Sequence, residues 1–335
     1  MESHTSKSAE LLRRLISLLA TYVIRSERTG PSTATFWYIS DPAMITSPEA
    51  LSAYHSPALG SPPYFIDYRP KLSYRQTNSN GIVILNYPDP IGAQVNPEAA
   101  FQYALGLHDA YLATRDETLR ASFLHYADTF AADQSSGGQW LYRFDWHHSR
   151  APWSSSLAQS RGMSVMLRAW LLTHKPLYRS AAISGAAPLE VPLEHGGLQA
   201  LHPMANVPYY EEYPGEPTAV LNGFMATLFG LYELGCWLEP KFSELFMLGI
   251  RSLEAMLPFY RRGSWTLYDL DTRSPVANLN SPYYYRKEVG YLAVLALLSG
   301  SARLASEYAW RVQRNSVFRR WAAITLKARR KILYK

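Results

Sequence analysis

The sequence predicts a mainly α protein of the α+β class: helical hairpins forming an α/α toroid-like domain, with a smaller β-containing N-terminal region. Three observations predict this. Apolar residues recur at spacings of three and four from Asn96 onward, the period of amphipathic helices. Short connections alternate with long ones, and short connections make antiparallel helix pairs. Before Asn96, Pro, Gly, Ser and Tyr dominate, and short β-rich runs such as residues 82–85 replace the helical period.

Four segments follow from these patterns. We expect an N-terminal amphipathic helix over 1–28, a β-containing region over 29–95, the α/α domain over 96–302 and a basic C-terminal helix over 303–335. Pro97 and Pro217 are placed where a first helical turn accepts proline. The expected helices cover 97–113, 116–133, 156–174, 177–186, 217–236, 240–259, 286–299 and 303–332.

Composition and charge limit the function classes. The chain has 335 residues, of which 47% are hydrophobic and 18% charged, so it is globular and not disordered. Residues 303–335 hold ten Lys or Arg and one acid, a local balance of +9 in a chain whose total is +6. This field would attract an anionic substrate. A solvated basic face is the plainer interpretation, and docking on an anionic surface stays open.

Cysteine and hydropathy patterns bear on the compartment. Cys236 is the one cysteine, which excludes an internal disulfide and fits a reducing compartment. The His and Cys residues have no zinc spacing, so we expect no metal site. No run of 18 apolar residues occurs, and no cleavage site follows the apolar stretch 10–24. We expect a cytoplasmic protein, with association at the inner-membrane surface left open.

Residues 209–226, YYEEYPGEPTAVLNGFMA, concentrate acids and phenols beside prolines. Glu211 and Glu212 stand among three tyrosines, a density that helix packing does not require. Such groups could take a proton from carbon or hold a sugar. An exposed acidic turn before a helix is the alternative interpretation. The two glutamates are neighbours and would point apart, so they are no evidence for a glycosidase pair.

Six strings, between about residues 80 and 300, carry a resemblance to the D-glucuronyl C5-epimerase family. They are PEAAFQYALG (97–106), APWSSSLAQSRGMSVMLRAWLLT (151–173), EHGGLQA (194–200), YEEYPGEPTAVLNGFM (210–225), SLEAMLPFYRRGSWTLYDL (252–270) and NLNSPYYYRKEVGYLAVL (278–295). The resemblance implies conversion of glucuronate to iduronate in heparosan- or heparan-type chains. It also implies a β-rich N-terminal part beside an α/α domain.

The resemblance assigns roles to individual residues. Glu212 matches the catalytic glutamate, and Tyr268 and Tyr284 match two catalytic tyrosines, with Tyr285 as the competing assignment for the second. The substrate-binding candidates are Tyr213, Tyr103, Trp153, Gln159, Arg161, Asn278 and Arg286. Three departures from the family pattern stand out: Ser154 replaces a tyrosine, Arg161 a glutamine and Asp271 an arginine. Arg161 and Arg286 are expected to supply the missing cation.

Inverting C5 of a uronate requires acid/base groups on both faces of the ring and a neutralised carboxylate. We expect Glu212 and Tyr284 to face each other across the ring, with Tyr268 assisting. No Gly-rich dinucleotide loop occurs, so we expect no cofactor. The expected partner is an anionic uronate-containing polysaccharide. A homodimer stays open, and nucleic acid is not expected. A uronate lyase and a non-catalytic polysaccharide-binding protein are the alternative functions.

Overall fold

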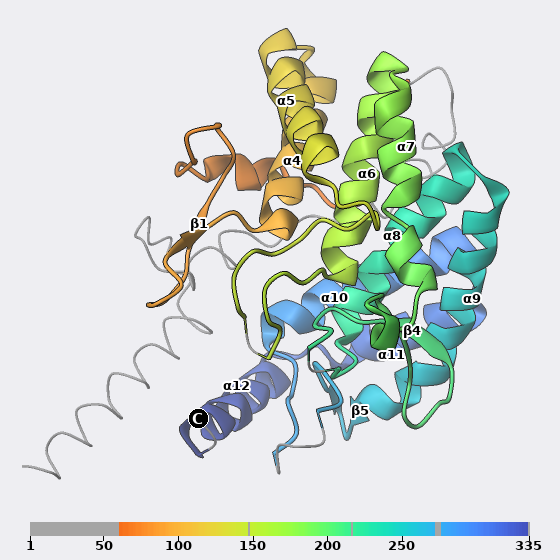
Figure 1. Ribbon diagram of the computed structural model, residues 1–335. Coiled ribbons are helices and arrows are strands. Elements are labelled where there is room, and N and C mark those ends of the chain that lie inside the picture. The colour runs from red at the N-terminus through yellow and green to blue at the C-terminus, as the bar shows by residue number, and fades with distance from the viewer. Residues whose placement is uncertain (1–59, 147, 216, 272–275, 334–335) are drawn as a thin grey trace, which may run out of the picture.

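The computed structural model describes residues 60–146, 148–215, 217–271 and 276–333 (Figure 1). The predicted helix over 1–28 and the start of the β-containing region therefore lie outside the described residues. The described helices are α4 (Pro97–Thr114), α5 (Glu117–Asp133), α6 (Ser156–Thr173), α7 (Pro176–Ser184), α8 (Leu221–Trp237), α9 (Pro240–Met256), α10 (Pro282–Ser299), α11 (Ala302–Arg314) and α12 (Val317–Leu333).

The helices form two rows. Helices α4, α6, α8 and α10 pack side by side in chain order, and α5, α7, α9 and α11 each pack against the helix before them. The described part of the chain is thus built from successive helical hairpins, and the predicted mainly α class is confirmed. Within the described ranges, no helix combines the length and apolar character needed to cross a bilayer.

Local sequence explains where these helices begin and end. Asn96 caps α4 by accepting a hydrogen bond from the backbone N–H of Ala99, and Pro97 occupies the first turn. Arg115 then ends the helix in the left-handed conformation, at φ 59°. Ser281 caps α10 in the same way as Asn96 caps α4. These caps fix the direction in which each hairpin enters the packed rows.

Three helix boundaries differ from the sequence-based prediction. The predicted helix over 303–332 is two helices, α11 and α12, because the chain leaves helical geometry at Asn315. Pro217 lies before α8, which begins only at Leu221. Helix α10 begins at Pro282 because the Ser281 cap and Pro282 together start it earlier than the apolar period indicates.

The strands of the described residues are short and occur as antiparallel pairs. They are β1 (Leu85–Asn86) with β2 (Ala93–Gln94), β3 (Gln199–Leu201) with β4 (Pro208–Tyr210), and β5 (Arg261–Arg262) with β6 (Trp265–Thr266). The first pair and the 3-10 turn η2 (Arg69–Ser73) precede α4. The other two pairs lie in the loops that connect the helices.

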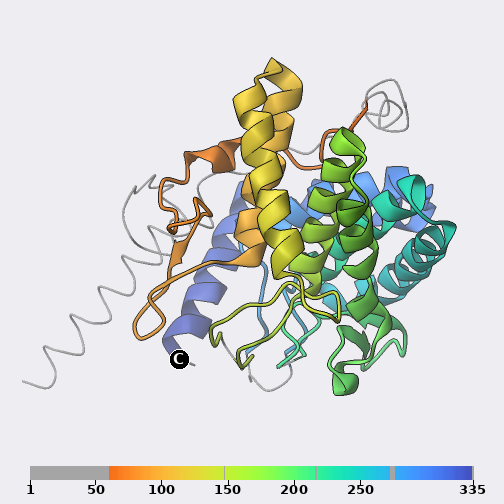
Figure 2. The ribbon, with the colours of Figure 1, turned by 45° about the horizontal axis from the view of Figure 1, so that its top comes forward.

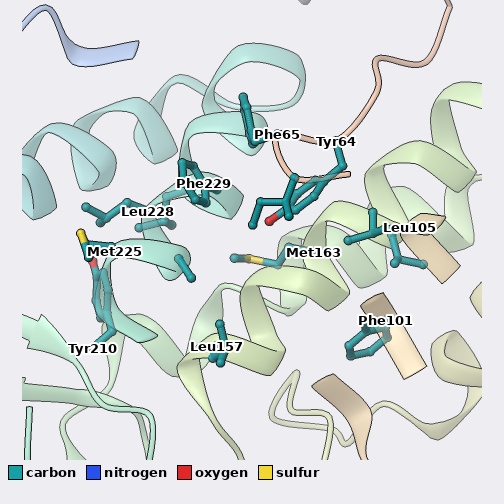
Figure 3. Packing of buried hydrophobic residues seen from close by; sticks show 14 of the residues in the cluster. Tyr64, Phe65, Phe101, Leu105, Leu157, Met163, Tyr210, Met225, Leu228 and Phe229 are labelled. Carbon is teal, nitrogen blue, oxygen red and sulfur yellow. The ribbon is translucent and has the colours of Figure 1, made fainter. Parts of the chain in front are cut away.

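The core joins the N-terminal segment to the helical rows. Phe65 stacks on Phe229 of α8 with ring centroids 5.1 Å apart, and Phe101 of α4 meets Trp140 at 5.2 Å. Figure 3 shows Phe65 and Tyr64 reaching over α8 and α6 from the segment before α4. The segment over residues 64–74 is therefore part of the main hydrophobic core.

The long connections gather at one end of the helices, opposite the projecting end where α4 joins α5 (Figures 1 and 2). Backbone hydrogen bonds hold them together. Ser156 N–H donates to Glu211 O at 3.1 Å, and Leu270 N–H donates to Thr218 O at 2.8 Å. Residues distant in sequence thus meet next to the first turns of α6, α8 and α10.

Candidate active site

Glu211 holds the loop that follows β4. Its fully buried carboxylate accepts hydrogen bonds from the Tyr209 hydroxyl at 2.9 Å and the Ala219 N–H at 3.0 Å. It also accepts from the N–H groups of Glu212 and Tyr213. Ala219 adopts φ 51°, a left-handed conformation that these bonds and a 2.5 Å hydrogen bond from Tyr260 to its carbonyl maintain. Glu211 therefore shapes the loop, and the acidic pair is not an exposed turn.

Glu212 points in another direction, toward the first turn of α8. It is 6% exposed, and its Oε2 is buried without a hydrogen-bond partner among the described residues. A Cβ on Gly223 would lie 2.3 Å from that oxygen, so only glycine leaves room for the carboxylate. Burial raises the pKa of Glu212 to about 7, although Lys287 and a hydrogen bond from Tyr213 lower it. A carboxylate with this pKa is suited to act as a base at neutral pH.

Two tyrosines, Tyr268 of the loop after β6 and Tyr284 of α10, meet near this carboxylate. The rings of Tyr268 and Tyr284 lie 4.8 Å apart at 60°. Burial and the charge of Glu212 raise the pKa of Tyr268 far above its usual value, and Tyr213 is shifted in the same way. Tyr268 and Tyr213 are therefore protonated phenols at neutral pH, able to donate a proton or a hydrogen bond. The structure brings Glu212, Tyr213, Tyr268 and Tyr284 together.

Backbone contacts position both aromatic groups. The N–H of Tyr268 donates to Asn278 O at 2.7 Å, and its carbonyl accepts from Leu221 N–H at 3.2 Å. Tyr284 lies in the first turn of α10, where its N–H donates to the capping Ser281 hydroxyl at 3.3 Å. One tyrosine is thus fixed by the start of α8 and the other by the start of α10.

Tyr285, the competing assignment, lies in a different cluster. It is fully buried, stacks on Trp265 at 3.8 Å and donates a hydrogen bond to Arg311 O at 2.9 Å. These contacts use both the ring and the hydroxyl for packing. The geometry therefore favours Tyr284.

Gln159 and Arg161 lie in the interior, away from any surface that a sugar could reach. The Gln159 amide accepts from Trp140 N–H at 2.8 Å and donates to Gly138 O and Gly185 O. Arg161 donates to the hydroxyls of Tyr64, Tyr68 and Tyr291. Both side chains are fully buried, because α6 packs between α4 and α8. Their placement corrects the expectation that they bind substrate directly.

Trp153 and Tyr103 border other clusters. Trp153 stacks on Tyr142 at 4.0 Å and approaches Tyr213 at 6.1 Å, so it supports the site through that tyrosine. Tyr103 of α4 stacks between Tyr126 and Tyr74, at 5.3 and 6.5 Å.

Asn278 and Arg286 flank the tyrosine pair. The Asn278 amide donates to Asp269 Oδ2 at 2.6 Å, and its carbonyl holds Tyr268 as described above. Arg286 is half-buried on α10, two residues after Tyr284. Two residues is more than half a helical turn, so Arg286 and Tyr284 occupy different faces of α10.

Three charged residues near the site were not predicted from the sequence. Lys287 lies with its Nζ 5.8 Å from the Tyr284 ring centroid. Glu98 of α4 and Lys71 of η2 are buried, and each interacts electrostatically with Lys287. The three-residue spacing from Tyr284 could have pointed to Lys287. Nothing local marks Lys71 or Glu98, whose proximity arises from packing between distant elements.

Part of this chain is similar in sequence to known proteins. Residues 133–314 match the protein family described as D-glucuronyl C5-epimerase C-terminus. A D-glucuronyl C5-epimerase of Caenorhabditis elegans is 31% identical over 180 residues, which cover 48% of this chain and 29% of that protein. An uncharacterised protein of Methanocaldococcus jannaschii is 29% identical over 136 residues, covering 39% of this chain and 44% of its own. The matching regions thus span less than half of either relative.

Proposed function

The chain belongs to the D-glucuronyl C5-epimerase C-terminal family, and from this premise we propose that it inverts C5 of glucuronate residues in a polysaccharide. The observation that carries the proposal is the meeting of Glu212 with Tyr268 and Tyr284. A buried carboxylate of raised pKa lies near the phenol of Tyr268, whose ring contacts that of Tyr284 at the start of α10. This set supplies a base and an acid without a cofactor.

The proposed reaction has two proton transfers. Glu212 takes the C5 proton, the C5–H bond breaks, and its electron pair moves into the adjacent carboxylate to give an enediolate. The Tyr284 hydroxyl then donates its proton to C5 from the opposite face, forming the new C–H bond. Tyr268, in ring contact with Tyr284 and electrostatically coupled to Glu212, gives its proton to the Tyr284 phenolate and takes the proton that Glu212 carries, which restores all three groups.

Deuterium incorporation tests the proposal. We expect the protein, incubated in D₂O with an oligosaccharide of alternating glucuronate and N-acetylglucosamine, to exchange H5 and form iduronate, read by proton NMR. Glu212→Gln and Tyr284→Phe should each lower the exchange by roughly 10²–10⁴-fold. Glu194→Gln and Tyr308→Phe change exposed residues outside the site and serve as matched controls.

Other outcomes would select other functions. An unsaturated, ultraviolet-absorbing product would indicate a lyase, in which the same carbanion expels the C4 substituent. Saccharide binding without H5 exchange would indicate a non-catalytic binding protein. Exchange at the parental rate in both site variants would remove Glu212 and Tyr284 from the mechanism.

A further inference from the structure

Lys287 lies on the helical face that carries Tyr284. Its Nζ is 5.8 Å from the Tyr284 ring centroid and 5.6 Å from that of Tyr291. The three residues follow a spacing of three and four, which aligns side chains along one face of α10. The ammonium therefore lies between two rings, close enough to Glu212 to lower the pKa of that carboxyl.

Lys71 brings a second ammonium group to the same place. It lies in η2, is 4% exposed, and its Nζ is 5.5 Å from the Tyr74 ring centroid. A Cβ on Gly106 would lie 2.5 Å from Tyr68 O, so the glycine lets η2 approach α4 closely. Burial, followed by repulsion from Lys287, lowers the pKa of Lys71 to about 7. Two lysines that are far apart in the sequence thus lie close enough to repel each other electrostatically.

The arginine candidates do not take this position. Arg161 is turned toward three tyrosine hydroxyls, with its Nε 3.9 Å from Glu98 Oε1. Asp271, where the family pattern has an arginine, faces Arg330 of α12 at 3.6 Å. Lys287, by contrast, lies directly against the Tyr284 ring.

We propose that Lys287, with Lys71 beside it, binds the carboxylate of the glucuronate residue whose C5 is inverted. The inference rests on the proposed function and names the binding group for its substrate. When the C5–H bond breaks, the electron pair adds a second negative charge to the carboxylate, and an adjacent ammonium stabilises it. The bound carboxylate also offsets the repulsion between the two lysine ammonium groups.

Saccharide binding measured by calorimetry tests this assignment. The probes are the glucuronate–N-acetylglucosamine oligosaccharide and its carboxyl-reduced counterpart, in which glucose replaces glucuronate. Lys287→Met should bind the carboxylate form roughly 10- to 100-fold more weakly and leave the affinity for the reduced form unchanged, because a charged hydrogen bond is lost only with the first. Lys287→Arg should keep most of the preference for the carboxylate.

The matched control is Lys241→Met, which removes an exposed lysine of α9 that pairs with Glu190 at 3.6 Å. It should bind both saccharides as the parent does. Lys71→Met should lose the same preference as Lys287→Met, and it provides the test if Lys287→Met unfolds.

Two results would overturn the assignment: an undiminished preference for the carboxylate form in both methionine variants, or equal losses for both saccharides. The proposed function fails separately. If the parent binds the carboxylate form through Lys287 but exchanges no H5 in D₂O, the binding group stands and the epimerase activity does not. A parent that binds neither saccharide would overturn both.

Discussion

Gly223 decides where the Glu212 carboxylate can lie. The glycine is in the first turn of α8, and Glu212 Oε2 occupies the volume that a Cβ would fill. The positive end of the helix dipole favours a negative charge there, while burial opposes it more strongly and raises the pKa of Glu212. The carboxylate thus lies at a helix terminus and still has a pKa above its ordinary value, which makes it a stronger base.

Replacing Gly223 tests that arrangement. Gly223→Ala places a methyl group 2.3 Å from Glu212 Oε2, so the carboxylate must move. Because a displacement of about 1 Å can cost roughly 100-fold in rate, we expect H5 exchange to fall by roughly 10- to 100-fold. Alanine suits a helix better than glycine, so the thermal melting midpoint should change little. An unchanged exchange rate would mean that the position of this oxygen is not critical.

The pKa of Glu212 predicts a pH profile. A base acts in its deprotonated form, and burial raises the pKa of Glu212 to about 7. Exchange of H5 should therefore rise tenfold per pH unit below about 7 and level off above it. The rate is measured by NMR across that range in the parent protein. A profile that levels off near pH 4.5, the ordinary value for glutamate, would contradict the raised pKa.

The same shift predicts a cost in stability. Because the folded-state pKa of Glu212 exceeds its unfolded value of 4.5, the folded protein binds more protons between pH 4.5 and about 7. The free energy of unfolding therefore decreases as pH rises through that window. Glu212→Gln should be more stable than the parent at pH 8, by up to about 3 kcal/mol, and similar to it near pH 4.5. Chemical denaturation at both pH values measures this, and a variant less stable at pH 8 would contradict it.

Helix α12 supports the loop that carries Tyr268. Its Lys327 donates to Leu279 O at 2.9 Å, and its Nζ lies 5.3 Å from the Tyr268 ring centroid. Arg330 of the same helix faces Asp271. Lys327 and Arg330 therefore bind the connection between β6 and α10. The positive charge of the C-terminal segment thus has a structural use in addition to any long-range electrostatic effect.

Removing one of these cations tests the support. Lys327→Met should lower the turnover rate of H5 exchange several-fold with little change in the saccharide concentration that half-saturates it, because Lys327 positions Tyr268 and does not bind the sugar. Arg319→Met, at a partly exposed position in the first turn of α12, is the matched control. A loss of apparent affinity equal to the loss of rate would instead indicate that Lys327 contacts the substrate.

Local patterns predicted the helices well because caps and apolar spacing are encoded within each helix. Asn96, Pro97 and the run after them specify α4 without reference to other elements. The break at Asn315 was missed although it also has a local signal, because the Ser316 hydroxyl accepts a hydrogen bond from Arg319 N–H at the start of α12. In the site, Glu212 and the tyrosines stand in recognisable strings. Lys71 lies outside them, and Glu98 lies in the first string without a mark of its role, because the proximity of both residues to Lys287 depends on how η2, α4 and α10 pack.

The family match begins at residue 133, yet the core and the site extend further toward the N-terminus. Helix α4 and the segment 64–74 pack on α6 and α8, and they supply Glu98 and Lys71. Arg161 illustrates the dependence. Its buried guanidinium uses the hydroxyls of Tyr64 and Tyr68, both outside the matched region. The matched region is therefore incomplete as a folding unit.

A chain shortened to residues 133–314 should not fold cooperatively. It leaves the Arg161 guanidinium without two of its partners, and a charge that stays buried without its partner costs roughly 3–5 kcal/mol. It also exposes Trp140, against which Phe101 packs at 5.2 Å. Because a domain is stable by only about 5–15 kcal/mol, these losses approach the whole margin. Thermal melting followed by near-ultraviolet circular dichroism compares the shortened and full chains. A sharp transition in the shortened chain, with saccharide binding retained, would show that the N-terminal elements are dispensable for both fold and site.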